Sequence, residues 1–283
     1  MSWRLEVTHT TGMRYSDPVA VSFNEARMTP ADSMGQLLIA HDLRVTPAAR
    51  VVSYTDYWGT LVEAFDVHEP HTQLEVVSRN VVDTPAAASR PDGVSWDVMS
   101  ANAVTDTWCE YLRASNYVDH ADADPNRIGI VHRLASLATP RDAIDLALSE
   151  VTGHLAYITG STSVSTTASE AWVAGSGVCQ DFTHVTLSLL RSVGIPARYV
   201  SGYLYAGDGE IGQTVTGESH AWVEVWDGQW WACDPTNGNP VGEAHTAVAR
   251  GRDYSDVSPL KGVYSGGNSE ELGVSVALTR LPR

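Results

Sequence analysis

The sequence predicts an α+β protein in which an N-terminal antiparallel β-sandwich or barrel precedes helices packed on a second antiparallel sheet. Residues 3–84 contain short runs in which apolar and polar side chains alternate, the pattern of strands with one buried face. After residue 93 the apolar residues recur mostly every three to five positions, which is typical of helices. Three more strand-like runs follow between residues 197 and 233.

The β region is expected to span residues 1–85 and to contain six or seven strands. Leu5 and Val7 alternate with charged and polar neighbours, so one face of the first strand should be buried. Pro18, Pro47 and Pro70 mark turns between the runs. Further strands are predicted at residues 36–45, 50–54, 60–67 and 73–82.

A linker is predicted at Thr84–Gly93, which is rich in proline and alanine. It separates the β region from a second region at residues 93–283. The first helix of that region is predicted over residues 96–112. A second helix is predicted to begin at Pro140, because proline is favoured in the first turn of a helix. Residues 160–169 are rich in serine and threonine and are expected to form a loop.

A glycine-rich turn leads into a third predicted helix that begins at or next to Cys179. Gly194 and Pro196 follow its apolar run and are expected to end it. A helix N-terminus carries partial positive charge and unpaired N–H groups, which favour a thiolate over a thiol. The sequence therefore predicts that Cys179 is a nucleophile, whereas Cys109 and Cys233 are interpreted as small buried hydrophobic residues.

Three strands are predicted after this helix, at residues 197–205, 220–226 and 229–233. Asp227 and Gly228 are typical of a two-residue hairpin, so the last two strands should be antiparallel neighbours. In this register His220 lies opposite Pro235, and Asp234 comes beside the imidazole.

These residues form a predicted catalytic site. A nucleophilic cysteine needs a base within hydrogen-bond reach, and the base needs an orienting group. We therefore predict Cys179 as nucleophile, His220 as base and Asp234 as the carboxylate that fixes the imidazole tautomer. The backbone N–H of Cys179 is an expected oxyanion donor. Four tryptophans are expected to crowd the site and exclude water: Trp222, Trp226, Trp230 and Trp231.

Other polar residues near these motifs are predicted to have structural roles. Asp181 is expected to cap the start of the helix, and His184 to pack in or behind the site. Glu218 and Glu224 are predicted to be solvated charges that flank the strands. The acidic, glycine-rich segment 206–219 is expected to form a loop at the mouth of the site, where it either gates access or only connects two strands.

Composition limits the classes of partner. The chain has 18 Lys and Arg against 34 Asp and Glu, a net charge of −16, which disfavours nucleic acids and anionic membranes. It has no signal-like segment and no apolar run of the about 20 residues that span a bilayer. Three cysteines without CxxC spacing and histidines without HExxH spacing predict neither disulfides nor a metal site. We therefore expect a cytoplasmic protein with no cofactor and no metal.

The blocks that carry the three predicted catalytic residues resemble the bacterial transglutaminase-like superfamily, whose members adopt a papain-like cysteine-protease fold. The similar blocks are residues 177–182, 194–203, 219–225, 231–237 and 251–262. The N-terminal β region resembles the β domain that precedes the core in this bacterial group. The resemblance implies a β domain at residues 1–85 and a transglutaminase-like catalytic core at residues 93–283.

The resemblance also implies an activity. Its members form a thioester on the cysteine of a Cys-His-Asp triad, which Cys179, His220 and Asp234 match, and then pass the acyl group to water or an amine. A cysteine protease or amidase acting on peptides or proteins is therefore expected. Two alternatives stay open, a true protein-glutamine gamma-glutamyltransferase and a non-catalytic peptide-binding module on the same fold. No EF-hand-like spacing of acids is present, so calcium dependence is not expected.

Overall fold

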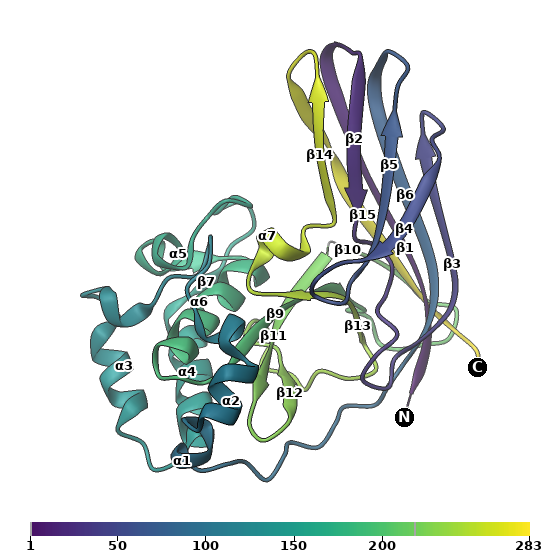
Figure 1. Ribbon diagram of the computed structural model, residues 1–283. Coiled ribbons are helices and arrows are strands. Elements are labelled where there is room, and N and C mark those ends of the chain that lie inside the picture. Colours follow the sequence, from purple (N-terminus) through teal and green to yellow (C-terminus); the bar gives the residue numbers. More distant parts are fainter. Residues whose placement is uncertain (1, 218) are drawn as a thin grey trace.

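The computed structural model describes residues 2–217 and 219–283, which form a β-rich part beside a helical part (Figure 1). The chain begins with six strands: β1 (Trp3–Val19), β2 (Val21–Ala26), β3 (Leu37–Thr46), β4 (Val51–Thr55), β5 (Leu61–Val67) and β6 (His71–Thr84). The middle of the chain contains helices, 3-10 turns and two short strands: α1 (Trp96–Met99), α2 (Asn102–Thr107), η1 (Cys109–Leu112), η2 (Ala121–Ala123), α3 (Ile128–Ala135), α4 (Pro140–His154), β7 (Ala156–Tyr157), α5 (Ala168–Ala174), β8 (Ser176–Gly177) and α6 (Cys179–Ser192). The last part returns to strands around one short helix: β9 (Ala197–Leu204), β10 (Thr214–Gly217), β11 (Ser219–Trp226), β12 (Trp230–Cys233), β13 (His245–Gly251), α7 (Tyr254–Val257), β14 (Leu260–Ser265) and β15 (Ser269–Leu281).

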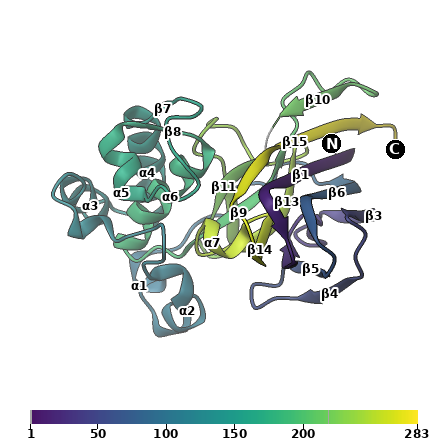
Figure 2. The same cartoon turned by 90° about the horizontal axis from the view of Figure 1, so that it is seen from above.

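Two antiparallel sheets form the predicted β-sandwich, which stands beside the helices in Figure 2. Their strand orders are β10-β15-β1-β6-β3 and β14-β2-β5-β4. Apolar side chains from both sheets meet in a common core, as alternation along the strands predicts. These side chains are Tyr15, Val19, Ala26, Met28, Phe65, Val67, Leu74 and Val76.

The end of the chain returns to the sandwich. β15 pairs with β1 from Leu281 opposite Arg4 to Ser269 opposite Tyr15, and β14 pairs with β2. Sheet pairing therefore crosses the predicted division of the chain into residues 1–85 and 93–283. The sequence pattern could not reveal this pairing, because it joins strands from opposite ends of the chain and no turn sets their register.

A third antiparallel sheet, ordered β12-β11-β9-β13, lies between the sandwich and the helices. α6 packs on one face of it through apolar side chains. The same hydrophobic core continues into the sandwich, so the two parts of the molecule share buried surface. Its members include Val185, Leu189, Val223 and Val225 beside Leu5, Val7 and Val276.

The helical part is more broken than predicted. Residues 96–112 form α1, α2 and a 3-10 turn instead of one helix, because the backbone of Ala101 is extended. The Ser100 hydroxyl also donates to the carbonyl of Trp96, which competes with continuation of the helix. The predicted start of a helix at Pro140 is confirmed, with Thr139 as its N-cap.

The helices α3 and α5 were not predicted. The start of α5 was assigned to the loop at residues 160–169, although it carries a capping box in which Thr167 and Glu170 bond each other's backbone N–H groups. Among the described residues, no helix has the length and apolar character needed to cross a membrane.

Candidate active site

Cys179 is the first residue of α6, as predicted. The preceding Val178 is extended, and its N–H donates to Oδ2 of Asp181 over 2.8 Å. The same oxygen accepts a 2.6 Å hydrogen bond from Thr162, while burial raises the pKa of this carboxyl. Asp181 therefore caps the first turn of the helix, which confirms the role predicted for it.

The glycine before this turn has a steric purpose. A Cβ at Gly177 would lie 2.5 Å from the Cβ of Asp181 and 2.6 Å from its Oδ2, closer than real Cβ atoms come. The capping carboxylate can therefore reach the N-terminus of α6 only because residue 177 has no side chain. The placement of Cys179 depends on this close approach.

β11 and β12 bring His220 and Asp234 together in a register that differs from the predicted one. Trp226 pairs with Trp230, so the connection has three residues, Asp227–Gln229, instead of two. Asp234 directly follows the last residue of β12. Its Oδ2 nevertheless accepts a 2.8 Å hydrogen bond from Nε2 of His220, so the predicted contact is present.

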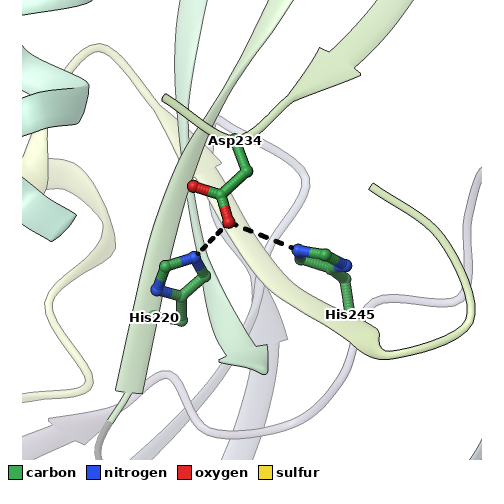
Figure 3. A group of neighbouring side chains, drawn as sticks. All are labelled: His220, Asp234 and His245. Carbon is green, nitrogen blue, oxygen red and sulfur yellow. Dashed lines mark hydrogen bonds and ion pairs between the residues drawn. The ribbon is translucent and has the colours of Figure 1, made fainter. Parts of the chain in front are cut away.

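Several donors fix the carboxylate of Asp234. Its Oδ1 accepts from the N–H of Thr236 over 2.9 Å, and its Oδ2 accepts from the side-chain amide of Asn237 over 2.8 Å. His245, on β13, places its Nε2 3.6 Å from the same Oδ2 (Figure 3). Burial alone would raise the pKa of this carboxyl, but the hydrogen bond from His220 and the nearby His245 ring hold the pKa of Asp234 well below its usual range. The carboxylate is therefore ionised and fixed in orientation.

His245 is the part of the site that sequence reasoning missed. The N–H of Gly242 donates to its Nδ1 over 3.3 Å. Because Nδ1 accepts, the hydrogen of the neutral ring lies on Nε2 and points toward Asp234. The two histidines therefore flank one carboxylate (Figure 3). Pairing of His245 with Leu204 of β9 brings it here, and no local motif in the sequence signals that pairing.

His220 connects Asp234 to Cys179. Its bond to Asp234 uses Nε2, and the Cys179 sulfur lies close enough to the ring to affect its titration. Burial of His220 disfavours the charged ring, yet the hydrogen bond to Asp234 and the neighbouring Cys179 outweigh burial and raise the pKa of His220 from 6.5 to about 9. The imidazole is therefore protonated at neutral pH beside the sulfur.

A cavity of about 700 Å³ opens over Cys179 and His220. Its wall is formed by β10 and β15 of the sandwich, by β9 and β11 of the third sheet, and by the helical part. The described lining contains no Asp, Glu, Lys or Arg side chain. Apart from Cys179 and His220 themselves, the space next to the sulfur therefore offers no charged partner, which favours an uncharged reacting group there.

The predicted tryptophan wall is wrong for the cavity over the sulfur, although the Trp222 ring lies 6.0 Å from the His220 ring and 5.3 Å from the His245 ring, centroid to centroid. Trp222, Trp230 and Trp231 line a separate cavity of about 140 Å³, where residues 33–36 of the sandwich cover the third sheet. Trp226 packs against the hydrophobic core. The aromatic side chains that line the cavity over the sulfur are tyrosines: Tyr157, Tyr199 and Tyr254.

Glu224 is not the solvated charge that the sequence predicts. It is 2% exposed, and its Oε2 accepts from Nε of Arg198 over 2.7 Å and from Nε of Arg250 over 2.9 Å. Burial alone would raise its pKa, but the charges of the two arginines lower the pKa of Glu224. Residues 33–36 also cover this face of β11, which explains the burial. Glu218 lies outside the described residues.

The remaining predicted positions agree in part. His184 is fully buried, accepts from the N–H of Tyr254 over 3.2 Å, and burial lowers its pKa to about 3. It is a packing residue, as predicted.

Cys233 is buried, and burial raises the pKa of its thiol well above the ordinary value. Cys109 is only half-buried. The predicted loop at residues 206–219 contains β10 and contributes Ala206 and Gly217 to the wall of the cavity.

Comparison with known families matches both parts of the chain. The bacterial transglutaminase-like N-terminal region matches residues 5–83. The transglutaminase-like superfamily matches residues 129–235, a range that includes Cys179, His220 and Asp234.

Relatives match nearly the whole chain, and a solved structure shares its fold. An uncharacterized protein of Mycobacterium leprae is 43% identical over 99% of both chains, and one of Mycobacterium tuberculosis is 34% identical over 96% of this chain and 91% of its own. A candidate cysteine protease of Cytophaga hutchinsonii shares the fold, with a TM-score of 0.80 and 19% identity over 100% of this chain and 92% of its own. The chain belongs to the bacterial transglutaminase-like superfamily.

Proposed function

We propose that the protein is a thiol enzyme that forms a thioester on Cys179 from the acyl part of a peptide or protein amide. The observation that supports this most is that Cys179 and His220 line one cavity while the far side of the His220 ring is hydrogen-bonded to Asp234. A nucleophile, a base and an orienting carboxylate in series are the requirements of acyl transfer through a cysteine.

In the first step the Cys179 sulfur attacks the amide carbon, and the carbonyl oxygen takes the negative charge. The N–H of Cys179 lies in the first turn of α6, where no intrahelical acceptor exists for it, and it stabilises that oxyanion. The C–N bond then breaks, and the imidazolium of His220 gives its proton to the departing amine. The acyl group is left as a thioester on sulfur.

In the second step water or a primary amine attacks the thioester carbon. The now neutral His220 takes the proton of the attacking group, and the C–S bond breaks to return the thiolate. Asp234 stabilises the imidazolium in both steps and keeps Nδ1 of the ring directed at the sulfur. His245 and Asn237 act through Asp234, by holding its carboxylate in place.

Apart from Cys179 and His220, the described lining of the cavity is uncharged, which supports a neutral reacting group, such as the side-chain amide of glutamine or a backbone amide. We also propose a cytoplasmic location, because the three cysteines are free thiols and reducing compartments preserve such thiols.

A peptide library analysed by intact mass tests the proposal. With and without an added primary amine, a gain of about 1 Da indicates deamidation, a fragment indicates hydrolysis, and an amine adduct indicates transglutamination. Cys179→Ala should abolish each product while its circular dichroism spectrum stays that of the wild type. Equal turnover by Cys179→Ala and wild type would overturn the proposal.

A further inference from the structure

One edge of the sandwich ends at the cavity over Cys179. β15 pairs with β1 along its whole length, but its other side pairs with β10 only from Thr279 to Val276. Within residues 2–217 and 219–283, strand pairing on this side stops at Val276, opposite Gly217. Ser219 pairs with Tyr203 of β9.

The backbone of Val274 faces this open side. Arg280 donates its N–H to the carbonyl of Gln213 and accepts from the N–H of Gly212, so the N–H and C=O of Arg280 point toward β10. In an antiparallel strand every second residue points the same way, which places the N–H and C=O of Val276 and Val274 on that side. The irregularity in the β1–β15 pairing lies beyond Val274, near Gly273, and leaves this order unchanged.

The open edge is accessible and belongs to the cavity. Gly273 and Val274 line the same 700 Å³ space as Cys179 and His220. Val274 is 38% exposed, whereas Val276, two residues along the strand, is fully buried. Gly217, the last residue of β10, also lines the space, so the line of β10 runs directly into it.

We propose that the acyl-donor substrate binds as an extended peptide segment that adds to β15 at Val274, in line with β10, and presents an uncharged amide to Cys179. This inference rests on the proposed function and names its substrate class. An unpaired strand edge binds an extended backbone through main-chain hydrogen bonds, and alternate side chains of the peptide then enter pockets. The lack of Asp, Glu, Lys and Arg side chains in the described lining restricts the reacting side chain, while the backbone contacts at β15 accept any sequence.

The first test uses the wild-type enzyme and the library peptide with the highest turnover. Single N-methyl groups are placed at successive peptide bonds, each of which removes one N–H donor. Strand addition predicts that kcat/KM falls about five- to tenfold at alternate positions, the equivalent of one hydrogen bond, and changes little at the positions between.

The second test compares Val274→Pro with Val274→Ala. Both variants remove the branched valine side chain, but only proline removes the outward N–H, and a strand edge tolerates proline. Val274→Pro should raise KM for the peptide about five- to tenfold relative to Val274→Ala. The iodoacetamide alkylation rate of Cys179 and the melting temperature serve as controls that report an intact site and fold.

The outcomes separate the two proposals. Turnover that is insensitive to N-methylation at every position, or is equally sensitive at all of them, overturns strand addition and leaves the thiol mechanism standing. Absence of turnover with every library peptide overturns the proposed function and, with it, this inference.

Discussion

Asp234→Asn should move the alkaline limb of the activity profile to lower pH by about two units. The pKa of His220 is raised from 6.5 to about 9, so its surroundings favour the imidazolium by about 3 kcal/mol. Burial acts against that charge, while Asp234 supports it through a 2.8 Å hydrogen bond. Asparagine keeps the shape of the side chain but not its charge. Burial of His220 is then opposed only by Cys179, and the pKa falls back toward 6.5.

The sign of the pH effect follows from the role of His220 as the acid that protonates the leaving amine. In the wild type, kcat/KM should fall as pH rises through about 9; in the variant it should fall from about pH 7. The same shift contributes to stability, because the folded pKa lies above the unfolded one. That contribution is complete below pH 6.5 and is lost as pH rises through about 9, and the variant should lose it at all pH values.

The assay is kcat/KM between about pH 5 and 10, combined with imidazole 15N chemical shifts of His220 over the same range. Asp42→Asn is the matched control, because this carboxylate pairs with Arg44 on the surface with 55% of its side chain exposed. An alkaline limb that stays near pH 9 in Asp234→Asn would refute the assignment of Asp234 as the group that holds the proton on His220.

Three further outcomes are expected. Iodoacetamide should label Cys179 in the native protein far faster than buried Cys233, as followed by peptide mass spectrometry; equal rates would contradict selective activation. Glu224→Ala should lower the free energy of unfolding by about 3–5 kcal/mol, because two largely buried arginines lose their partner; a urea titration that shows less than about 1 kcal/mol would contradict the buried network. Gly177→Ala should lower the free energy of unfolding by about 1–3 kcal/mol, because the added Cβ lies 2.5 Å from the Cβ of Asp181. Gly153→Ala is the control and should cause no such loss, because no atom lies within 4 Å of its added Cβ. Similar losses in both variants would show that the turn at Gly177 adapts to the added methyl group.

The sequence predicted the parts of the site that depend on local chain geometry. The start of α6 is set by its glycine-rich turn and apolar run, so Cys179 could be placed at a helix N-terminus from those signals. His220 and Asp234 are close in sequence and joined by a hairpin, so their proximity also followed from local pattern. The connection between the strands is one residue longer than predicted. The contact still forms because Asp234 lies beyond the end of β12, where the alternation of the strand does not fix the direction of its side chain.

The parts that the sequence did not predict depend on contacts between distant segments. His245 reaches Asp234 through the pairing of β13 with β9. Trp222 and Glu224 lie on the same face of β11 by strand alternation, and nothing in their own sequence shows that residues 33–36 cover that face. Only the arrangement of the sandwich on the third sheet decides that a glutamate expected in solvent is buried with two arginines.

The sandwich is therefore part of how the site works. His9 of β1 hydrogen-bonds Tyr203 of β9 over 2.8 Å, and the side chain of Gln36 donates to the carbonyl of Ala247 on β13. The sandwich is therefore bonded to two strands of the third sheet. β15 is held in place by β1 and also forms the wall of the cavity at Val274. In the proposed strand addition, the substrate contacts the sandwich while its amide reaches the helical part. Substitutions that loosen β1 should consequently raise KM for long peptides before they alter alkylation of Cys179, because the sulfur is positioned by α6 and the peptide by β15.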